Sequence, residues 1–242
     1  MVNTLDHYSR NIDVLAQAGV DVVLLPEKIA TINSQYDILQ HLSDKALQTK
    51  TALIVGLSNR DNEKYYNSAY LFSKHGELSI KYDKQHLVPA FEGRYTPGNV
   101  HGIVEPRSMG KWGIEICKDM DFVNPALDYS QQGINIMFVP ALDFHDDGWS
   151  HGRVAIMRGV EGNFAVARAG QWGLLTLSDS KGRVIQKVST DGAEEGAFLI
   201  GEVSLGEGKS LYSRMGNWFG WFSLGLTILL GWFYRLRYKR GG

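Results

Sequence analysis

The fold is decided by residues 113–119, GIEICKD, where an apolar, β-branched run ends at Cys117, the single cysteine of the chain. Asn124-Pro125 follows within a few residues and indicates the start of a helix. A strand that delivers a cysteine to a sharp turn before a helix is how α/β enzymes present a nucleophile. Cysteine is also often a buried structural residue, so this stretch alone leaves both interpretations open.

Apolar spacing predicts the elements on either side of this stretch. The predicted helices cover residues 4–18, 34–49, 124–132 and 150–161. The predicted strands cover residues 20–25, 51–57, 66–72, 78–82, 109–117, 134–139, 164–168, 174–178, 184–188 and 197–203. Runs such as 21–25 and 134–139 are almost wholly apolar, which is typical of strands inside a layered sheet. The mixed order predicts an α/β fold with sheets covered by helices on one face each.

Composition limits the classes of function. A chain of 242 residues suits one large domain, or one domain with an appendage, and 44% hydrophobic with 21% charged residues describes a globular protein. The net charge of −1 includes four basic residues at the C-terminal end, so the body is mildly acidic and nucleic acid is not an expected partner. One cysteine excludes an intrachain disulfide and a zinc site with several cysteine ligands.

The C-terminal segment has a different character. Residues 215–234 contain no charge, and about 20 residues of helix are just enough to cross a bilayer core. We therefore expect two parts: a domain at 1–213 and a transmembrane helix with a basic cytoplasmic tail at 214–242. The cluster at 235–240 would stay in the cytoplasm by the positive-inside tendency, which places residues 1–213 outside it. A buried C-terminal helix is the alternative, and no signal peptide is visible near the N-terminus.

Three polar residues end or follow predicted strands: Glu27, Lys84 and Cys117. A layered sheet could bring them to one rim, where they would form a complete acyl-transfer set. A carboxylate can take the thiol proton, and a cation beside a carbonyl oxygen stabilises the tetrahedral oxyanion. Taken singly, Glu27 could be a helix-start carboxylate and Lys84 an ordinary surface lysine.

These segments resemble a known family. Residues 25–27 (LPE), 84–89 (KQHLVP) and 116–119 (ICKD) resemble, in this order, the three signature segments of the nitrilase (carbon–nitrogen hydrolase) superfamily. Residues 82–92 and 214–218, the latter leading into a last membrane helix and a basic tail, are more specifically similar to the apolipoprotein N-acyltransferases. The resemblance covers nearly the whole chain.

The resemblance implies a nitrilase-type α-β-β-α sandwich and a triad of Glu27, Lys84 and Cys117, supported by Glu92. It also places three residues at the substrate: Lys118, Asp119 and Trp149. The implied reaction is ping-pong. The thiol takes an acyl group from a phospholipid, and the thioester passes it to the α-amine at the lipidated N-terminus of a lipoprotein. The expected setting is the inner membrane, with no cofactor and no metal.

The chain also departs from this pattern. The acyltransferases carry a bundle of membrane helices before the catalytic domain, and the superfamily domain opens with a strand ahead of the first helix. We expect both to be absent here, so another chain, such as a separate membrane subunit, is a candidate partner. Lys118 and Asp119 stand where the acyltransferases have an aromatic residue and a glutamate, and Glu115 adds a charge that the two-residue period puts on the strand face of Cys117. These changes bear on the acyl substrate more than on the triad.

Two other functions remain open. A tethered nitrilase-type amidase would use the same triad with water as the second nucleophile, and a non-catalytic remnant or subunit would only bind. An apolar groove near Cys117 would favour acyl transfer, and its candidate lining is Phe91, Tyr95, Phe144 and Trp149. A Cys–His protease has His86, His145 and His151 available, and a metal site would use His145, Asp146, Asp147 and His151. No supporting motif favours either, and a solvated loop is the simpler interpretation.

Overall fold

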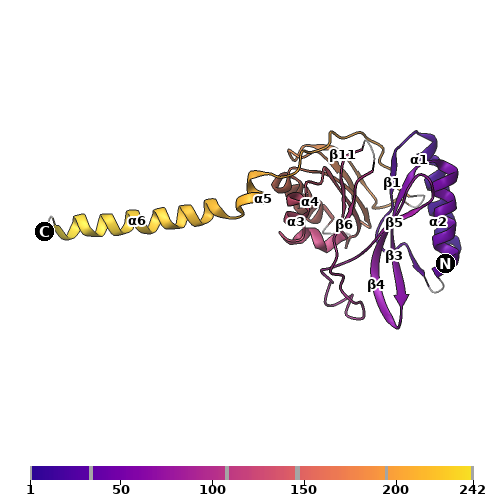
Figure 1. Cartoon of the computed structure of the whole chain (residues 1–242), viewed down its shortest axis with the longest axis horizontal. Helices are drawn as coiled ribbons and strands as arrows, with labels where there is room; N and C mark the ends of the chain where they lie inside the picture. The colour runs from indigo at the N-terminus through magenta and orange to yellow at the C-terminus, as the bar shows by residue number, and fades with distance from the viewer. Residues whose placement is uncertain (1, 33–34, 107–108, 145–147, 194–195, 241–242) are drawn as a thin grey trace.

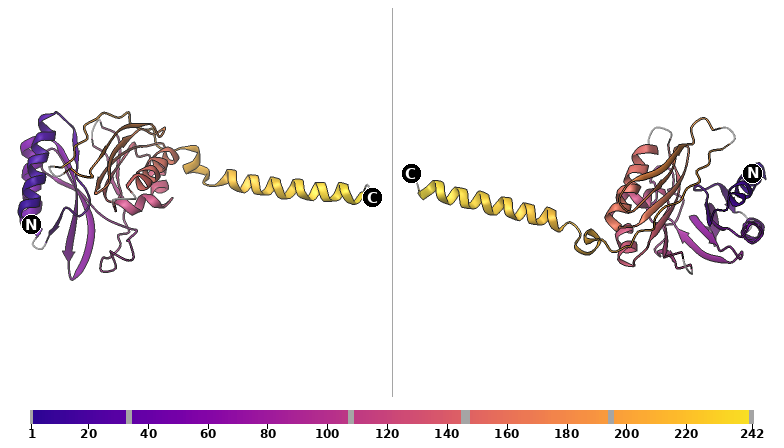
Figure 2. Two further views of the ribbon diagram at one scale, coloured as in Figure 1. Left: turned by 180° about the vertical axis from the view of Figure 1, so that it is seen from behind. Right: turned by 90° about the horizontal axis from the view of Figure 1, so that it is seen from above.

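Two β-sheets packed face to face between two helical layers form the body of the protein (Figures 1 and 2). The computed structural model describes residues 2–32, 35–106, 109–144, 148–193 and 196–240. Within them, the four-layer α-β-β-α sandwich implied by the sequence resemblance is the observed fold.

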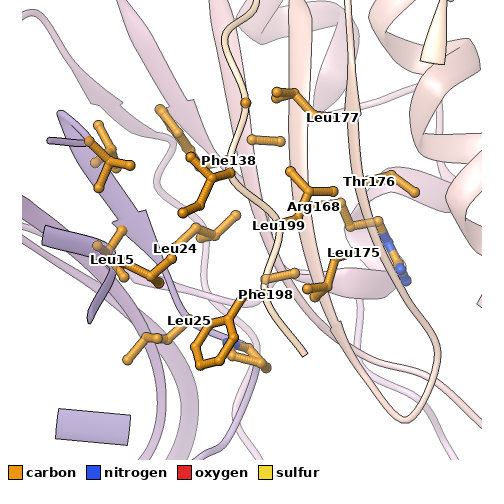
Figure 3. A pocket seen from close by; sticks show the side chains of 18 of the residues that line it. Leu15, Leu24, Leu25, Phe138, Arg168, Leu175, Thr176, Leu177, Phe198 and Leu199 are labelled. Carbon is orange, nitrogen blue, oxygen red and sulfur yellow. The ribbon is translucent and has the colours of Figure 1, made fainter. Parts of the chain in front are cut away.

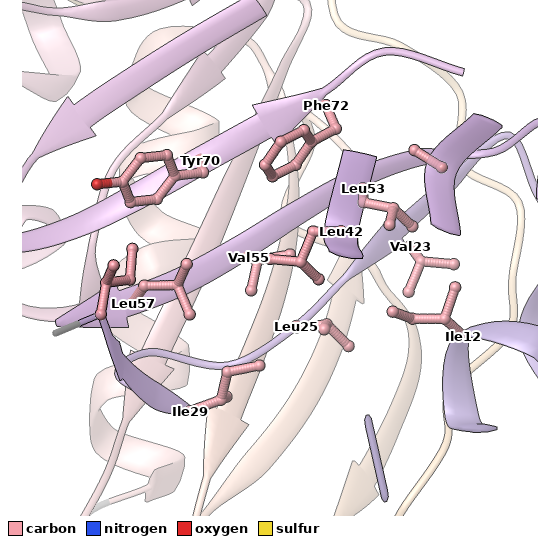
Figure 4. Packing of buried hydrophobic residues seen from close by; sticks show 12 residues of the cluster. Ile12, Val23, Leu25, Ile29, Leu42, Leu53, Val55, Leu57, Tyr70 and Phe72 are labelled. Carbon is pink, nitrogen blue, oxygen red and sulfur yellow. The ribbon is translucent and has the colours of Figure 1, made fainter. Parts of the chain in front are cut away.

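The first sheet carries the N-terminal half of the chain. Its strands run in the order β1-β3-β4-β5, and β2 also pairs with β3. The bounds are α1 Val2–Gln17, β1 Val22–Leu24, β2 Ala30–Ile32, α2 Gln35–Thr49, β3 Ala52–Asp61, β4 Lys64–Phe72 and β5 Leu78–Asp83. The two helices cover its outer face, where Ile12 of α1 and Leu42 of α2 pack on Val23, Leu53 and Val55 (Figure 4). Alternate residues of each strand therefore face the helices.

The second sheet has six strands in the order β11-β10-β9-β8-β7-β6. The bounds are β6 Gly102–Val104, β7 Trp112–Ile114, the 3₁₀-helix η1 Cys117–Asp121, α3 Ala126–Gln131, β8 Ile136–Leu142, α4 Gly148–Gly162, β9 Ala165–Gln171, β10 Leu174–Ser178 and β11 Val184–Ser189. Helices α3 and α4 cover its outer face, where Tyr129 and Ala155 pack on Met137, Val139 and Val166.

A separate apolar cluster joins the two sheets. Ile54 and Leu71 of the first sheet pack with Trp112, Ile114 and Phe138 of the second. Because the central strands contribute to this cluster on one face and to a helix-covered cluster on the other, they are apolar on both faces, as the sequence indicated.

Several boundaries differ from the sequence prediction. The strand expected at 109–117 is only β7, and the chain turns into η1 at Cys117. Helix α3 begins at Ala126 with Pro125 as its N-cap, two residues later than the predicted start at 124. Strands β2 and β6 were not predicted. The strand expected at 197–203 is absent: the segment is irregular, and no backbone hydrogen bond links it to a described neighbour.

The chain ends in a short helix, α5 Leu211–Met215, and a long one, α6 Trp218–Arg240. Helix α6 projects away from the sandwich (Figure 1). Its residues 218–238 form one helix long and apolar enough to cross a membrane by length and composition, and the body buries none of it.

Candidate active site

Glu27 lies just beyond β1, at the rim where the sheets meet. Its backbone N–H donates to the carbonyl of Ala141 in β8 at 3.3 Å, which ties the first sheet to the second. Strand β3 passes so close that a Cβ on Gly56 would lie 2.5 Å from the carbonyl oxygen of Pro26 and 2.6 Å from Cα of Glu27. Glycine is therefore required at position 56, because a larger residue would clash with the backbone that carries Glu27.

Lys84 follows β5 directly and is almost completely buried. Its ammonium lies 2.9 Å from Oε1 of Glu27 and 2.9 Å from Oε2 of Glu92. Burial alone would lower the pKa of Lys84, but the negative charges of the neighbouring carboxylates Glu27 and Glu92 outweigh burial and raise the pKa. Lys84 is therefore a fixed cation.

Glu92 is held as an anion. Burial would raise the pKa of Glu92, but Lys84, the N–H of Val88 and the charge of Lys28 lower it to about 2. Lys28 Nζ lies 3.0 Å from Oε1 of Glu92. Glu92 thus gives Lys84 a second carboxylate partner beside Glu27 and balances part of its charge.

Asn67 of β4 is a member of this network that sequence reasoning missed. Its Nδ2 donates to Oε1 of Glu27 at 2.5 Å and to Oε1 of Glu92 at 2.6 Å. These bonds occupy one oxygen of Glu27, while Oε2 is buried without a hydrogen-bond partner among the described residues. A carboxylate oxygen left open in this way can accept a proton from a nearby donor.

Cys117 begins η1 with a positive φ of 45°, a backbone conformation that non-glycine residues rarely adopt. Its Sγ is 3.6 Å from the carbonyl oxygen of Leu142, the end of β8. Burial and the negative charge of Glu27 raise the pKa of the thiol to about 12, although Lys84 and Arg168 act to lower it. The resting cysteine is therefore a neutral thiol that needs a base.

A buried ion pair lies next to the carbonyl of Leu142 that faces Cys117, and sequence reasoning also missed this pair. Arg168 of β9 donates to both oxygens of Asp143, at 2.8 Å and 2.5 Å, and both side chains are buried. Asp143 directly follows Leu142, so this pair fixes the carbonyl that faces the thiol. The available signal was the position of Asp143 after an apolar strand, the same pattern that selected Glu27 and Lys84.

The predicted substrate residues occupy different places. Lys118 is partly buried in η1, directly after the cysteine. Trp149 lies in the first turn of α4 and is 37% exposed, with its ring centroid 4.6 Å from Nζ of Lys187 in β11. Asp119 has no exposed surface. Its carboxylate accepts from the hydroxyl of Tyr82 at 2.7 Å and from the backbone N–H of His86 at 2.7 Å, so it points into the protein rather than to a substrate.

Asp119 links the segment that follows Lys84 to the turn that carries Cys117. It accepts from the N–H groups of Gln85 and His86, which follow Lys84, and from the N–H of Ile116, which precedes Cys117. One buried carboxylate therefore fixes the relative position of two strand ends that carry chemistry. Glu115, expected beside the thiol, is fully buried, and burial raises its pKa well above the ordinary value.

The candidate groove aromatics divide into two groups. Phe91 and Phe144 pair at a ring distance of 5.0 Å and are exposed, whereas the Tyr95 hydroxyl bonds Ser58 at 2.8 Å. Of the loop residues weighed for a metal site, His145, Asp146 and Asp147 lie outside the described residues. His151 instead faces Asp121 at 3.3 Å.

A cysteine beside a buried carboxylate–ammonium network, at the rim of an α-β-β-α sandwich, is an arrangement that can activate a thiol nucleophile. The sequence profile of the carbon–nitrogen hydrolases matches residues 3–211, and the chain belongs to this family. Its relatives include amidases and acyltransferases, so the family is one of enzymes.

Several relatives are similar over most of the chain. An apolipoprotein N-acyltransferase of Geobacter metallireducens is 28% identical and covers 83% of this chain, and one of Haemophilus ducreyi is 24% identical and covers 98%. The matched parts are 43% and 52% of those proteins, so the chain spans about half the length of these curated relatives. An omega-amidase of Mus musculus is 28% identical over 73% of the chain and 75% of its own length.

Solved structures show the same fold. An amidase from Nesterenkonia sp. AN1 superposes with a TM-score of 0.70 at 19% identity, covering 77% of this chain and 82% of its own. The same amidase has been solved with the acetamide moiety of fluoroacetamide added covalently to its active-site cysteine.

Proposed function

We propose that the chain transfers an acyl group from a phospholipid to the N-terminal amine of a lipoprotein through a thioester on Cys117. The observation that carries the proposal is the buried network in which Lys84 joins Glu27 to Glu92, with one oxygen of Glu27 left open. The similarity to apolipoprotein N-acyltransferases over 83% and 98% of the chain supports lipid substrates, and the match over 98% is too long to leave out the apolar helix α6.

In the first half-reaction, Glu27 takes the thiol proton while Sγ of Cys117 attacks the ester carbonyl carbon. Lys84 and the backbone N–H of Lys118 stabilise the tetrahedral oxyanion. The intermediate expels the lysophospholipid oxygen, which takes the proton from Glu27, and a thioester remains.

In the second half-reaction, the acceptor amine attacks the thioester carbonyl, and Glu27 takes a proton from the amine nitrogen. The C–S bond breaks, the proton returns to sulfur, and the product is an amide. The same carboxylate thus serves as base in both halves, which requires that its position be fixed by Lys84 and Asn67.

The proposed setting is the inner membrane, with α6 crossing once, the basic tail in the cytoplasm and the sandwich on the other side. The exposed pair of Phe91 and Phe144 suits contact with acyl chains. A separate membrane subunit is a proposed partner, in addition to the two lipid substrates.

An amidase that hydrolyses a small C–N bond is the second candidate, favoured by the omega-amidase relative and by the solved amidases. It uses the same residues, with water in place of the amine. A non-catalytic subunit is the third, and the formed network of Glu27, Lys84 and Glu92 argues against it.

Mass spectrometry of the intact chain after incubation with phospholipid vesicles tests the proposal. We expect a long-chain acyl adduct on the wild type that hydroxylamine removes, and none on Cys117→Ala. Cys117→Ser should fold and fail to turn over. Labelling by small amides with no adduct from phospholipid would replace acyl transfer with the amidase, and labelling by neither would leave only the non-catalytic alternative.

A further inference from the structure

Two cations flank the indole of Trp149 in the first turn of α4. Nζ of Lys187 in β11 lies 4.6 Å from the centroid of this ring, and Cζ of Arg153, one turn further along α4, lies 5.8 Å from it. All three side chains are exposed. Within the part of the chain that the structure describes, neither cation forms an ion pair with a carboxylate. Because two unpaired positive charges at one ring repel each other, the cluster favours an anion bound beside it.

The register of the second sheet places this cluster close to the catalytic network. Arg168 of β9 pairs with Thr176 of β10, and Thr176 pairs with Lys187 of β11. Residues directly opposite each other in neighbouring strands share a face, so the three side chains form one row. Neighbouring strands lie about 4.8 Å apart, so the backbones of Arg168 and Lys187 are about 10 Å apart. Arg168 is the residue whose ion pair with Asp143 fixes the carbonyl that faces Cys117.

The row lies on the face of the sheet that α4 covers. Figure 3 shows the other face, where Leu175 and Leu177 of β10 line an apolar pocket. Because side chains alternate along a strand, Thr176 between them is directed away from this pocket, towards α4 (Figure 3). The position that a Cβ would take on Gly152 of α4 lies 3.8 Å from Cγ2 of Thr176 and 3.7 Å from Cε3 of Trp149. The indole therefore lies beside the row.

Thr176 gives a second, independent observation. Its side chain is 3% exposed, and its Oγ1 is buried without a hydrogen-bond partner among the described residues. Buried hydroxyl groups are nearly always paired, so an unpaired one between Arg168 and Lys187 indicates that a polar group or water enters the row. A ligand held at Lys187 would thus have a polar path towards the nucleophile.

We propose that the cations around Trp149 bind the phosphate of the glycerophospholipid donor while its ester carbonyl lies at Cys117. Both arginine and lysine form charge-assisted hydrogen bonds with phosphate oxygens. Six covalent bonds separate the sn-1 carbonyl carbon from phosphorus, and three bonds of an extended chain span about 3.8 Å, so the two groups lie up to about 7–8 Å apart. This span suits the roughly 10 Å between Arg168 and Lys187, since long side chains reach from both ends of the row. The inference rests on the proposed acyl transfer and names the part of the donor that the site recognises.

The first test compares two donors that differ in the phosphate-bearing headgroup. They are phosphatidylglycerol and diacylglycerol with the same acyl chains, each in micelles of a nonionic detergent, and mass spectrometry follows thioester formation on Cys117. We expect Lys187→Gln and Arg153→Gln each to lower the ratio of the two rates, phosphatidylglycerol over diacylglycerol, by about tenfold, as loss of one charge-assisted hydrogen bond should. The matched control is Lys181→Gln, which removes the same charge from an exposed lysine in the turn between β10 and β11 and should leave the ratio unchanged.

The second test measures binding without turnover. The indole N–H resonance of Trp149 in the ¹⁵N-labelled full chain is followed by NMR during titration with sn-glycerol 3-phosphate and, separately, with inorganic phosphate. We expect a saturable shift with glycerol 3-phosphate on the wild type, a weaker response to inorganic phosphate, and no shift in the double variant Lys187→Gln/Arg153→Gln.

The outcomes separate this subsite from the proposed acyl transfer. A shift on the wild type without acylation from any phospholipid would support the phosphate-ester site and refute the transfer. Acylation of the wild type with an unchanged donor ratio in both single variants would overturn the subsite and leave the transfer intact. An equal response to inorganic phosphate, together with an unchanged donor ratio, would also overturn it, because the cluster would then bind small free anions only.

Discussion

Replacing Lys84 with methionine removes the ammonium that joins Glu27 to Glu92 and keeps most of the apolar stem. In the wild type Nζ makes ion pairs of 2.9 Å with both carboxylates, all three groups being about 1% exposed. Loss of one partner from a buried ion pair costs about 3–5 kcal/mol. Lys28, 3.0 Å from Glu92, compensates in part. We therefore expect a loss of about 3 kcal/mol in the free energy of unfolding, at the lower end of that range.

The same substitution removes the proposed oxyanion cation. Deleting one such donor costs about 3 kcal/mol of transition-state stabilisation, which is about 150-fold in kcat/KM. The rate of thioester formation on Cys117, followed by mass spectrometry under single-turnover conditions, measures this loss. Urea melts of the same variant measure the loss in the free energy of unfolding.

A matched control is Lys45→Met, which breaks the ion pair of Lys45 with Asp13, a residue 42% exposed. Because Asp13 remains in contact with water, this pair should contribute less to stability than a fully buried one, and it lies far from the chemistry in sequence. If Lys84→Met folds poorly, the double variant Lys84→Met/Glu92→Gln removes one buried carboxylate as well and should regain stability without regaining rate. An unchanged acylation rate in the folded variant, or destabilisation no greater than that of Lys45→Met, would refute the reasoning.

Three further substitutions test buried carboxylates. The pKa of Glu92 is lowered from 4.5 to about 2, so the ionised carboxylate stabilises the fold by about 3 kcal/mol above pH 4.5, and this contribution is lost as pH falls through 2. Glu92→Gln should flatten the decline of stability in acid measured by urea melts, and an unchanged decline would contradict the assignment. Glu115, whose pKa burial raises, keeps its proton when the unfolded chain releases it, so wild-type stability should decline as pH rises above 4.5, and Glu115→Gln should remove this decline in thermal melts. Asp119→Asn turns an amide donor towards the N–H groups of Gln85 and His86, which should lower the free energy of unfolding by about 2 kcal/mol in urea denaturation. The same variant should lower kcat more than it changes KM. Wild-type kinetics would show that the hydrogen bonds from Asp119 to residues 85 and 86 have no catalytic consequence.

The sequence identified residues whose position follows from local pattern. Glu27 and Lys84 each come directly after an apolar run, and strand ends meet at one rim, so their proximity was predictable. Asn67 sits inside an ordinary strand pattern, and only the pairing of β4 with its neighbours reveals that it bridges two carboxylates. Arg168 could not be identified from the sequence for the same reason, because the pairing register of β8 and β9 determines that it meets Asp143.

The misplaced expectations have a common physical cause. The family resemblance placed Asp119 at the substrate, but η1 turns its side chain inward, where three backbone N–H groups and a hydroxyl donate to it. Residues 197–203 have the alternation of a strand, but a strand exists only where another backbone pairs with it. Both outcomes depend on partners distant in sequence, which periodicity does not record.

Charge balance explains why this site keeps its cysteine neutral until a substrate arrives. Two cations, Lys84 and Lys28, offset the carboxylates Glu27 and Glu92, so a preformed thiolate would be an unbalanced buried charge, and the pKa of Cys117 is raised to about 12 accordingly. Moving the proton from sulfur to Glu27 leaves the total charge of the network unchanged. In the proposed mechanism the negative charge then passes to the substrate oxygen, beside Lys84. A site arranged in this way favours the tetrahedral intermediate over the free thiolate, so its reactivity depends on a carbonyl being bound.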